Sequence, residues 1–300
     1  MSDKSDFFCT FAPVLITLIM KTNSQLRRQA RFGLEGNWGM MALCYLLIIL
    51  MSYVLMLPVE AGAAISAIKG GGAVATNTLF ANVWQILVVI AILPASWMLS
   101  VMCLRLVRGD YGSQQVRVGE VMEGYRHTNR VVFAYLAMVL VVIVILVVPI
   151  VLTVLWCGED TTRWLHSQDI EALGRMTMKF IPCIIIYVFV ALRLNLYCFL
   201  LWDTNLGAFA VLRESNRMMK GRCWKMFCLW LSFIGWAILA LFTFGIGFLW
   251  LQPYITASMG AFYDDIRAEE AAAAAEPETV EEPAVNEEQP AALDVEPKDE

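Results

Sequence analysis

The chain has 300 residues, of which 59% are hydrophobic and only 16% are charged. Water-soluble domains average about 45–50% apolar and about 25% charged residues, so this composition excludes an ordinary soluble fold. The net charge of −5 is unevenly distributed, because residues 267–300 carry −10 and leave +5 on residues 1–266. The sequence therefore predicts a basic membrane-embedded body followed by an acidic tail.

Residues 1–20 form an apolar N-terminal extension whose role the sequence leaves open. The apolar run from Phe7 to Met20 has fourteen residues, whereas a transmembrane helix needs about 20. The small-residue cleavage site of a signal peptide does not follow it, and Met20 resembles a translation start. We expect residues 1–19 to be either an upstream extension or an interfacial segment.

Six apolar segments make up most of residues 21–266. In lipid, a backbone must satisfy its own hydrogen bonds, and a helix does so within one segment. The predicted fold is therefore all-α, a multi-pass transmembrane bundle with cytoplasmic amphipathic helices. The last two segments are separated only by Gly245–Gly247, which predicts a tight helical hairpin. The predicted spans cover residues 39–59, 80–104, 131–156, 180–202, 226–244 and 248–262.

The distribution of lysine and arginine predicts the orientation of these spans. Fourteen basic residues lie in the segment before the first span and in the second–third and fourth–fifth connections. The connections on the opposite side hold only four. Because cytoplasmic loops carry the excess of basic residues, we expect both termini to be cytoplasmic.

Three of the cytoplasmic stretches share one amphipathic pattern. Each has apolar residues at helical spacing on one face, basic residues on another face, and a glycine before the next span. The glycines, which permit a sharp change of direction, are Gly36, Gly124 and Gly221. The apolar faces are Leu26, Ala30, Gly33 and Leu34; Val118, Val121, Met122 and Tyr125; and Val211, Leu212, Ser215, Met218 and Met219.

The basic faces of these stretches are candidate lipid-headgroup contacts. Anionic lipids of the cytoplasmic leaflet attract basic residues, and a basic amphipathic helix can lie in the membrane interface. The alternative is that these are the ordinary basic connections of an inner-membrane protein, without internal repetition. The candidate contacts are Arg27, Arg28, Arg31, Arg117, Arg126, Arg213, Arg217 and Lys220.

Arg193 is the least expected residue of the predicted spans. It lies nine residues before Trp202, roughly 13 Å from the inner interface at 1.5 Å per residue. Arginine near a span centre costs about 2.5–3.5 kcal/mol on insertion scales, so it needs a partner or a wet cavity. Asn195 and Asp203 complete a candidate intramembrane polar site, and Glu60 is a further candidate neighbour. An anion or lipid-headgroup site and a structural arginine both remain open.

No catalytic residue, metal site or cofactor is predicted, and we expect the protein not to be an enzyme. The two histidines, His127 and His166, are expected on opposite membrane faces, so they cannot form a dyad or share a metal. None of the eight cysteines forms a C-x-x-C pair, and no hydrolase, metalloprotease or nucleotide-binding motif is present. Most of the cysteines lie in apolar runs, where a thiol behaves as a small hydrophobe.

Residues 267–300 are predicted to be a disordered acidic tail, because an acidic low-complexity segment buries too little apolar surface to order itself. The alanine run 271–275 is the part expected to extend the preceding helix. Truncation after Arg267 should then leave abundance and topology intact. The preceding pair, Asp264 and Asp265, is expected to be solvated beyond a helix end.

The chain resembles a bacterial membrane family known as domain of unknown function 975. The resemblance covers most of residues 21–266 and rests on Q-A-R-F-G-L-E-G-N-W-G at 29–39, R-E-S-N-R-M-M-K-G at 213–221 and F-Y-D-D at 262–265. It implies a six-span, all-helical protein of the bacterial inner membrane without an assigned activity. A weaker similarity, to the membrane domain of some glycerophosphodiester phosphodiesterases, rests on an arginine in one span, a D-x-x-x-G start and an R-x-S helix.

Two functions from different classes remain open. The leading hypothesis is a non-enzymatic protein that organises lipid or partner proteins through its basic cytoplasmic helices. The expected partners are anionic membrane lipids and a membrane protein or a second copy of the chain, with no nucleic acid. The alternative is a transporter or channel with a polar site around Arg193.

Overall fold

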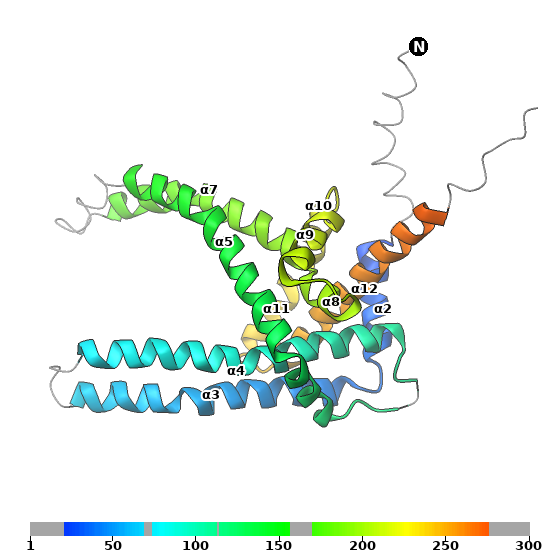
Figure 1. Cartoon of the computed structure of the whole chain (residues 1–300), viewed down its shortest axis with the longest axis horizontal. Coiled ribbons are helices and arrows are strands. Elements are labelled where there is room, and N and C mark those ends of the chain that lie inside the picture. Colours follow the sequence, from blue (N-terminus) through cyan, green and yellow to red (C-terminus); the bar gives the residue numbers. More distant parts are fainter. Residues whose placement is uncertain (1–20, 69–73, 113, 157–169, 276–300) are drawn as a thin grey trace, which may run out of the picture.

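The computed structural model describes residues 21–68, 74–112, 114–156 and 170–275 (Figure 1). Within these ranges the chain is helical and contains no strand, which confirms the all-α class. The expectations for residues 1–20, and for the tail beyond residue 275, lie outside the described residues.

The described helices follow one another closely along the chain. α2 is the short basic helix before the first span, and η1 is a 3₁₀-helix between α4 and α5. The elements are α2 (Asn23–Leu34), α3 (Trp38–Ile68), α4 (Val74–Arg108), η1 (Val118–His127), α5 (Thr128–Trp156), α7 (Ile170–Leu194), α8 (Tyr197–Asp203), α9 (Ala208–Met218), α10 (Cys223–Leu231), α11 (Ile234–Phe242) and α12 (Phe248–Ala275).

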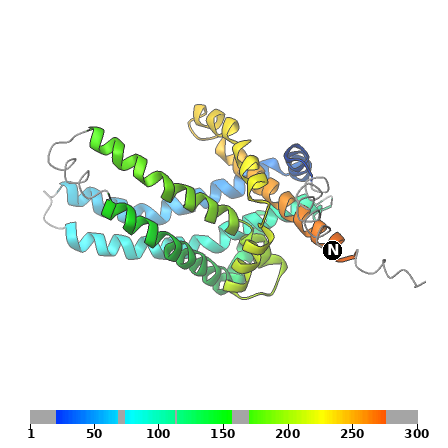
Figure 2. The same ribbon diagram turned by 90° about the horizontal axis from the view of Figure 1, so that it is seen from above.

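Two long hairpins form the frame of the molecule. α3 pairs with α4, and α5 pairs with α7, and the ends at which each pair is joined lie on the same side of the molecule (Figures 1 and 2). α2, α8 and the charged end of α12 lie toward the opposite side. The stretches with many basic residues therefore gather at one end.

α4 is the central helix against which most others pack. Its residues from Met98 to Leu104 are nearly all buried. Two glycines allow close approach to its backbone. A Cβ on Gly33 of α2 would lie 2.8 Å from Cα of Val107, and a Cβ on Gly124 of η1 would lie 2.3 Å from the carbonyl oxygen of Pro94. Any side chain at either glycine would force these elements apart.

The outward surfaces of the long helices are strongly apolar. Leu57 of α3 is 59% exposed, and Leu155 of α5 is 74% exposed. Five described helical runs are long and apolar enough to cross a membrane, and lipid would cover such surfaces. They are residues 38–62, 79–108, 118–153, 177–203 and 223–242.

The sixth predicted span, 248–262, opens α12, which is mostly an interior helix. Ala257, Ala261 and Phe262 are fully buried, and the helix packs on α2, α3 and α4. The number of spans therefore stays a prediction. α12 also extends beyond the predicted span through the alanine run to Ala275. Alanine has the highest helix propensity.

α11 and α12 form the tight hairpin that the sequence predicts. The chain reverses over residues 243–247, where Phe244 and Gly245 both adopt positive φ. Gly247 lies so close to α11 that a Cβ there would be 2.9 Å from Cα of Ala240. Along the long axis of the molecule, this turn lies level with the middle of α3 and α4 rather than with their joined ends (Figures 1 and 2).

The apolar residues that the sequence places on one face of α2 and of α9 are largely buried in the structure. Leu26, Ala30 and Leu34 are fully buried, and so are Val211 and Ser215. These faces pack on protein, because α2 contacts α12 and α4 and α9 contacts α5, α7 and α8. Gly36 and Gly221 have positive φ and end the two stretches, as expected.

The prediction for the middle stretch is wrong in its helical period. η1 is a 3₁₀-helix, in which residues three apart share a face. Val121 and Gly124 are therefore buried, whereas Met122 is 64% exposed. Gly124 provides close contact with α4 and not a turn. The 3₁₀ period places Val121 and Gly124 on the same face, and Gly124 of this face packs closely on Pro94 and Met98 of α4.

Candidate functional site

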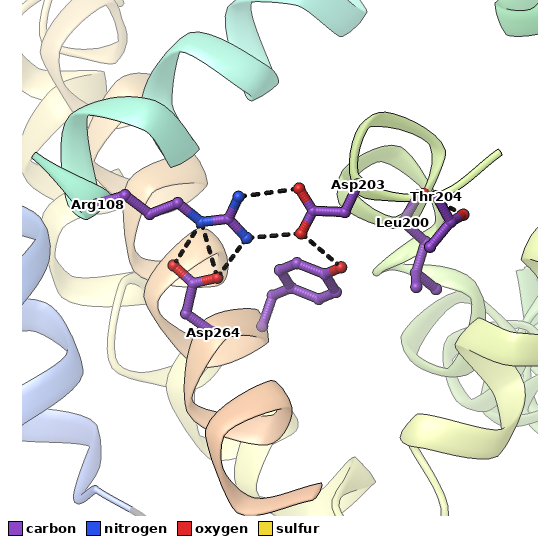
Figure 3. A network of polar contacts seen from close by, with 6 residues as sticks. Arg108, Leu200, Asp203, Thr204 and Asp264 are labelled. Carbon is purple, nitrogen blue, oxygen red and sulfur yellow. Dashed lines mark hydrogen bonds and ion pairs between the residues drawn. The ribbon is translucent and has the colours of Figure 1, made fainter. Parts of the chain in front are cut away.

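The guanidinium of Arg108 binds two carboxylates at once (Figure 3). Its Nη1 lies 2.9 Å from Oδ1 of Asp203 and its Nη2 2.6 Å from Oδ2, a bidentate pair. Its Nε lies 3.1 Å from each carboxylate oxygen of Asp264, and Nη2 lies 2.7 Å from Oδ1. The hydroxyl of Tyr263 donates to Oδ2 of Asp203 at 2.9 Å. We call these four residues the Arg108 network.

Local helix structure positions each member of this network. Arg108 is the last residue of α4, and Asp203 is the last residue of α8. α8 ends there because Thr204 turns extended while its hydroxyl and backbone N–H both donate to the carbonyl of Leu200 (Figure 3). Tyr263 of α12 is fully buried and stacks on the ring of Phe199, with centroids 5.6 Å apart.

The network is a pair of partly buried salt bridges that joins three helices. The side chains of Arg108, Asp203 and Asp264 are 27%, 11% and 23% exposed. One guanidinium between two carboxylates leaves a net negative charge. A second arginine, Arg267, is close to the network, since its guanidinium carbon lies 5.8 Å from the ring centre of Tyr263. Charge-assisted bidentate bonds are both strong and geometrically specific. The arrangement therefore fixes the relative positions of α4, α8 and α12.

The acidic stretch of α12 continues this pairing toward its end. Asp265, only 8% exposed, accepts from Nζ of Lys225 at 3.4 Å and from the backbone N–H of Lys21 at 3.0 Å. Glu269 lies 3.0 Å from Nη2 of Arg222. The expectation that Asp264 and Asp265 are simply solvated is therefore wrong. Arg108 of α4 binds Asp264, whereas Lys225 of α10 and the backbone N–H of Lys21 bind Asp265.

A second polar cluster joins η1 to the end of α4. The hydroxyl of Tyr111 donates to Oε2 of Glu120 at 2.6 Å, and Nη1 of Arg105 lies 3.3 Å from the same oxygen. Burial, together with this hydrogen bond, raises the pKa of Tyr111 above its ordinary value. Glu120 also accepts from the backbone N–H of Arg117 and so caps η1.

Arg193 lies in a different setting from the one predicted. α7 ends at Leu194 and does not continue to Trp202, because a turn at 195–196 separates it from α8. Arg193 therefore stands at a helix end beside α9. Its Nη1 donates to Oδ1 of Asn216 at 2.9 Å, and Ser215 donates to its carbonyl at 2.9 Å. These contacts hold the backbone and one edge of the guanidinium.

The other members of the predicted polar site lie elsewhere. Asp203 bonds to Arg108 instead, Asn195 lies in the turn between α7 and α8, and Glu60 is exposed on α3. In the described part of the chain, Arg193 forms no ion pair with a carboxylate, and its Nε is buried without a hydrogen-bond partner. The guanidinium carbon of Arg193 lies 4.8 Å from the ring centre of Phe189.

Two apolar grooves meet at this arginine. One, of about 630 Å³, lies between α7 and α10 and is lined by Ile185, Val188, Trp224 and Phe227. The other, of about 450 Å³, lies among α5, α7 and α9 and is lined by Ile145, Val190, Phe209, Leu212 and Arg213. Phe189 and Arg193 line both grooves and so form the ridge between them.

The candidate lipid-headgroup contacts separate into two groups. Arg217 is paired with Glu214 and Glu270, and its hydrogen bonds lower the pKa of Glu214. The remaining candidates have no carboxylate partner among residues 21–68, 74–112, 114–156 and 170–275. They are Arg27, Arg28, Arg31, Arg117, Arg126, Arg213 and Lys220.

The fold is an all-helical one in which five described runs are apolar enough to cross a membrane, and ion pairs join the helices at its polar end. Its residues 20–270 match the family described as "Protein of unknown function (DUF975)", and the chain belongs to that family. The predicted resemblance is thereby confirmed. No curated protein and no solved structure matches the chain. The weaker similarity to the membrane domain of glycerophosphodiester phosphodiesterases stays a prediction.

Proposed function

We propose that this protein is a non-enzymatic component of the bacterial inner membrane that organises anionic lipid around its basic end, with both termini cytoplasmic. The basic groups that lack carboxylate partners supply the attraction. Each basic residue near an anionic membrane surface contributes about 1 kcal/mol. Several together on one rigid frame would enrich anionic lipid beside the protein.

The observation that carries this proposal is the fixed orientation of α2. Its apolar face is buried against α12 and α4, so the helix is held by protein and not by lipid. Arg28 and Arg31 are exposed on the other side. Arg28 also lies over the ring of Phe32, which is 60% exposed, at 5.4 Å from its centre. A basic and aromatic surface of this kind suits the headgroup region.

The test is the lipid that co-purifies with the protein. Mass spectrometry should find a higher anionic fraction than in the bulk membrane, and the double variant Arg28→Gln/Arg31→Gln should reduce that enrichment. Arg175→Gln/Lys179→Gln is the matched control, since it removes two positive charges at the other end of the molecule, on α7. Co-purified lipid with the composition of the bulk membrane would reject the proposal.

The alternative, a transporter or channel with a site at Arg193, predicts substrate-dependent flux in liposomes. The geometry around Arg193 favours lipid. The grooves beside it open between helices whose lining side chains are outwardly exposed, such as Ile185 at 63% and Phe209 at 60%. An acyl chain meets such a surface directly, whereas a polar solute would have to cross it.

A further inference from the structure

Arg193 has a charge that the described protein does not neutralise. Arg108 shows the contrast, because its guanidinium donates to two carboxylates. Arg193 donates to one neutral amide, from Asn216, and its Nε–H is buried without an acceptor. An unsatisfied buried donor is costly, and so is a charged side chain without a partner inside a segment that crosses the membrane, such as the candidate span Thr177–Asp203.

The surroundings of Arg193 determine which counter-ion fits. The grooves on its two sides are lined by aliphatic and aromatic side chains, with no Asp or Glu in the described linings. Arg213 adds a second positive charge in the groove between α5, α7 and α9. Apolar grooves below a pair of arginines match a ligand with an anionic head and hydrocarbon chains.

The ridge between the grooves suggests how two hydrocarbon chains of such a ligand would be placed. Phe189 is 48% exposed and stands one helical turn from Arg193 on the same face of α7. Its ring borders the groove toward α10 and the groove toward α5. Chains that diverge below one headgroup would pass on either side of this ring.

We propose that Arg193 and Arg213 form a binding site for one anionic glycerophospholipid, whose acyl chains lie in the two grooves on either side of Phe189. The site rests on the proposed function and makes it specific. Arg193 binds the phosphate with the guanidinium donors that Asn216 leaves free, since guanidinium geometry suits phosphate oxygens. Asn216 and Ser215 hold Arg193 in place.

The experiment measures lipid retention by native mass spectrometry after transfer of the protein from phosphatidylglycerol or phosphatidylcholine nanodiscs into detergent. The wild type should retain one phosphatidylglycerol and exchange phosphatidylcholine freely. Arg193→Gln should weaken retention about tenfold or more, the effect of losing one charged hydrogen bond. Arg175→Gln, which removes an exposed charge from the other end of α7, outside the lining of both grooves, is the matched control and should leave retention unchanged.

A second variant tests the groove without changing charge. Ile185→Trp places a large side chain in the groove between α7 and α10, on an exposed position that tolerates it, and should also reduce retention. Arg193→Gln and Ile185→Trp must each keep the wild-type melting temperature. If Arg193→Gln does not, Arg193→Lys replaces it. If Ile185→Trp does not, Val188→Trp replaces it.

The outcomes separate this site from the wider function. If Arg193→Gln retains phosphatidylglycerol as the wild type does while Arg28→Gln/Arg31→Gln loses anionic enrichment, the Arg193 site is wrong and the proposed function stands. If the wild type retains no phosphatidylglycerol but its co-purified lipid is still anionic, the site is again wrong. If neither enrichment nor retention is seen, both proposals fail.

Discussion

Nη2 of Arg108 lies 2.6 Å from Oδ2 of Asp203, although the two residues are 95 positions apart in the chain. The bond joins the last residue of α4 to the last residue of α8. Asp264 of α12 approaches the same guanidinium from another side. Three helices that lie far apart in the sequence therefore meet at one guanidinium.

Arg108→Gln should lower the free energy of unfolding by about 2–3 kcal/mol, because it leaves two partly buried carboxylates facing each other without their cation. Thermal or denaturant unfolding in detergent micelles measures this loss. Arg126→Gln, an exposed arginine of η1, serves as the control and should be nearly neutral. Equal effects of the two variants would mean that the Arg108 network contributes no more than general charge.

Gly124→Ala should destabilise the protein by about 1–3 kcal/mol, since its Cβ would meet the carbonyl oxygen of Pro94 at 2.3 Å and overpack the contact of η1 with α4. Gly119→Ala is a matched substitution in the same 3₁₀-helix, and its Cβ would meet nothing within 4 Å. It should be neutral or slightly stabilising. A neutral result at Gly124 would show that η1 can move away from α4 at little cost.

The parts of the fold that local spacing determines are predictable from the sequence. The buried faces of α2 and α9 repeat at helical spacing, so the spacing alone is enough to place Leu26, Ala30 and Val211 inward. The hairpin at Gly245–Gly247 is equally predictable from the sequence, because three residues between two apolar runs leave room only for a tight reversal of the chain. The period of η1 is not, since it depends on contact with α4.

The ion pairs escape prediction because nothing in one sequence matches a charge to a partner far along the chain. In the sequence, Arg108 is only one of many basic residues that set orientation, and the adjacent acids of α12 resemble a solvated helix end. The weak signal is position, since Arg108, Asp203 and Asp264 each closely follow an apolar run. The predicted position of Arg193, inside a continuous span, is wrong for a related reason. Apolar residues lie on both sides of Leu194, so the sequence does not show that α7 ends there.

The turn between α11 and α12 should be protected from the external solution. From Gly247 to Asp264 the helix rises about 25 Å, less than the roughly 30 Å of a bilayer core, and Asp264 is held at the polar end by Arg108. The test compares Ile246→Cys with Ala61→Cys in spheroplasts, using a membrane-impermeant thiol reagent and subtracting the labelling of the native cysteines in the wild type. The cysteine at position 246 should react more slowly than the one at position 61. Equally fast labelling at both positions would support a hairpin that crosses fully, and so six spans.

Reporter fusions test the predicted orientation independently. Fusions after Gly112 and Arg222 should report the cytoplasm, because these two connections and the segment before the first span hold fourteen of the eighteen basic residues counted, and basic connections are typically cytoplasmic. Fusions after Gly71 and Thr162, two positions outside the described residues, should report the external side. An external signal at Arg222 would contradict the orientation.

Truncation separates the two parts of the acidic tail. The sequence predicts that residues after Arg267 are dispensable, but α12 continues to Ala275 and carries Glu269 and Glu270. Glu269 and its partner Arg222 are 10% and 14% exposed, whereas Glu270 and Arg217 are 28% and 54% exposed. The first pair should matter more, since exposed pairs contribute less than about 1 kcal/mol.

We therefore expect truncation after Ala275 to leave the melting temperature unchanged and truncation after Arg267 to lower it. In the full chain, Glu269→Gln should reproduce most of that loss, about 2 kcal/mol, because it leaves the partly buried Arg222 without its carboxylate. Glu270→Gln is the matched control and should have little effect, since Arg217 keeps Glu214. If both truncations behave alike and Glu269→Gln is neutral, the pairing at the end of α12 has no stabilising role and the tail after Arg267 is dispensable, as the sequence predicts.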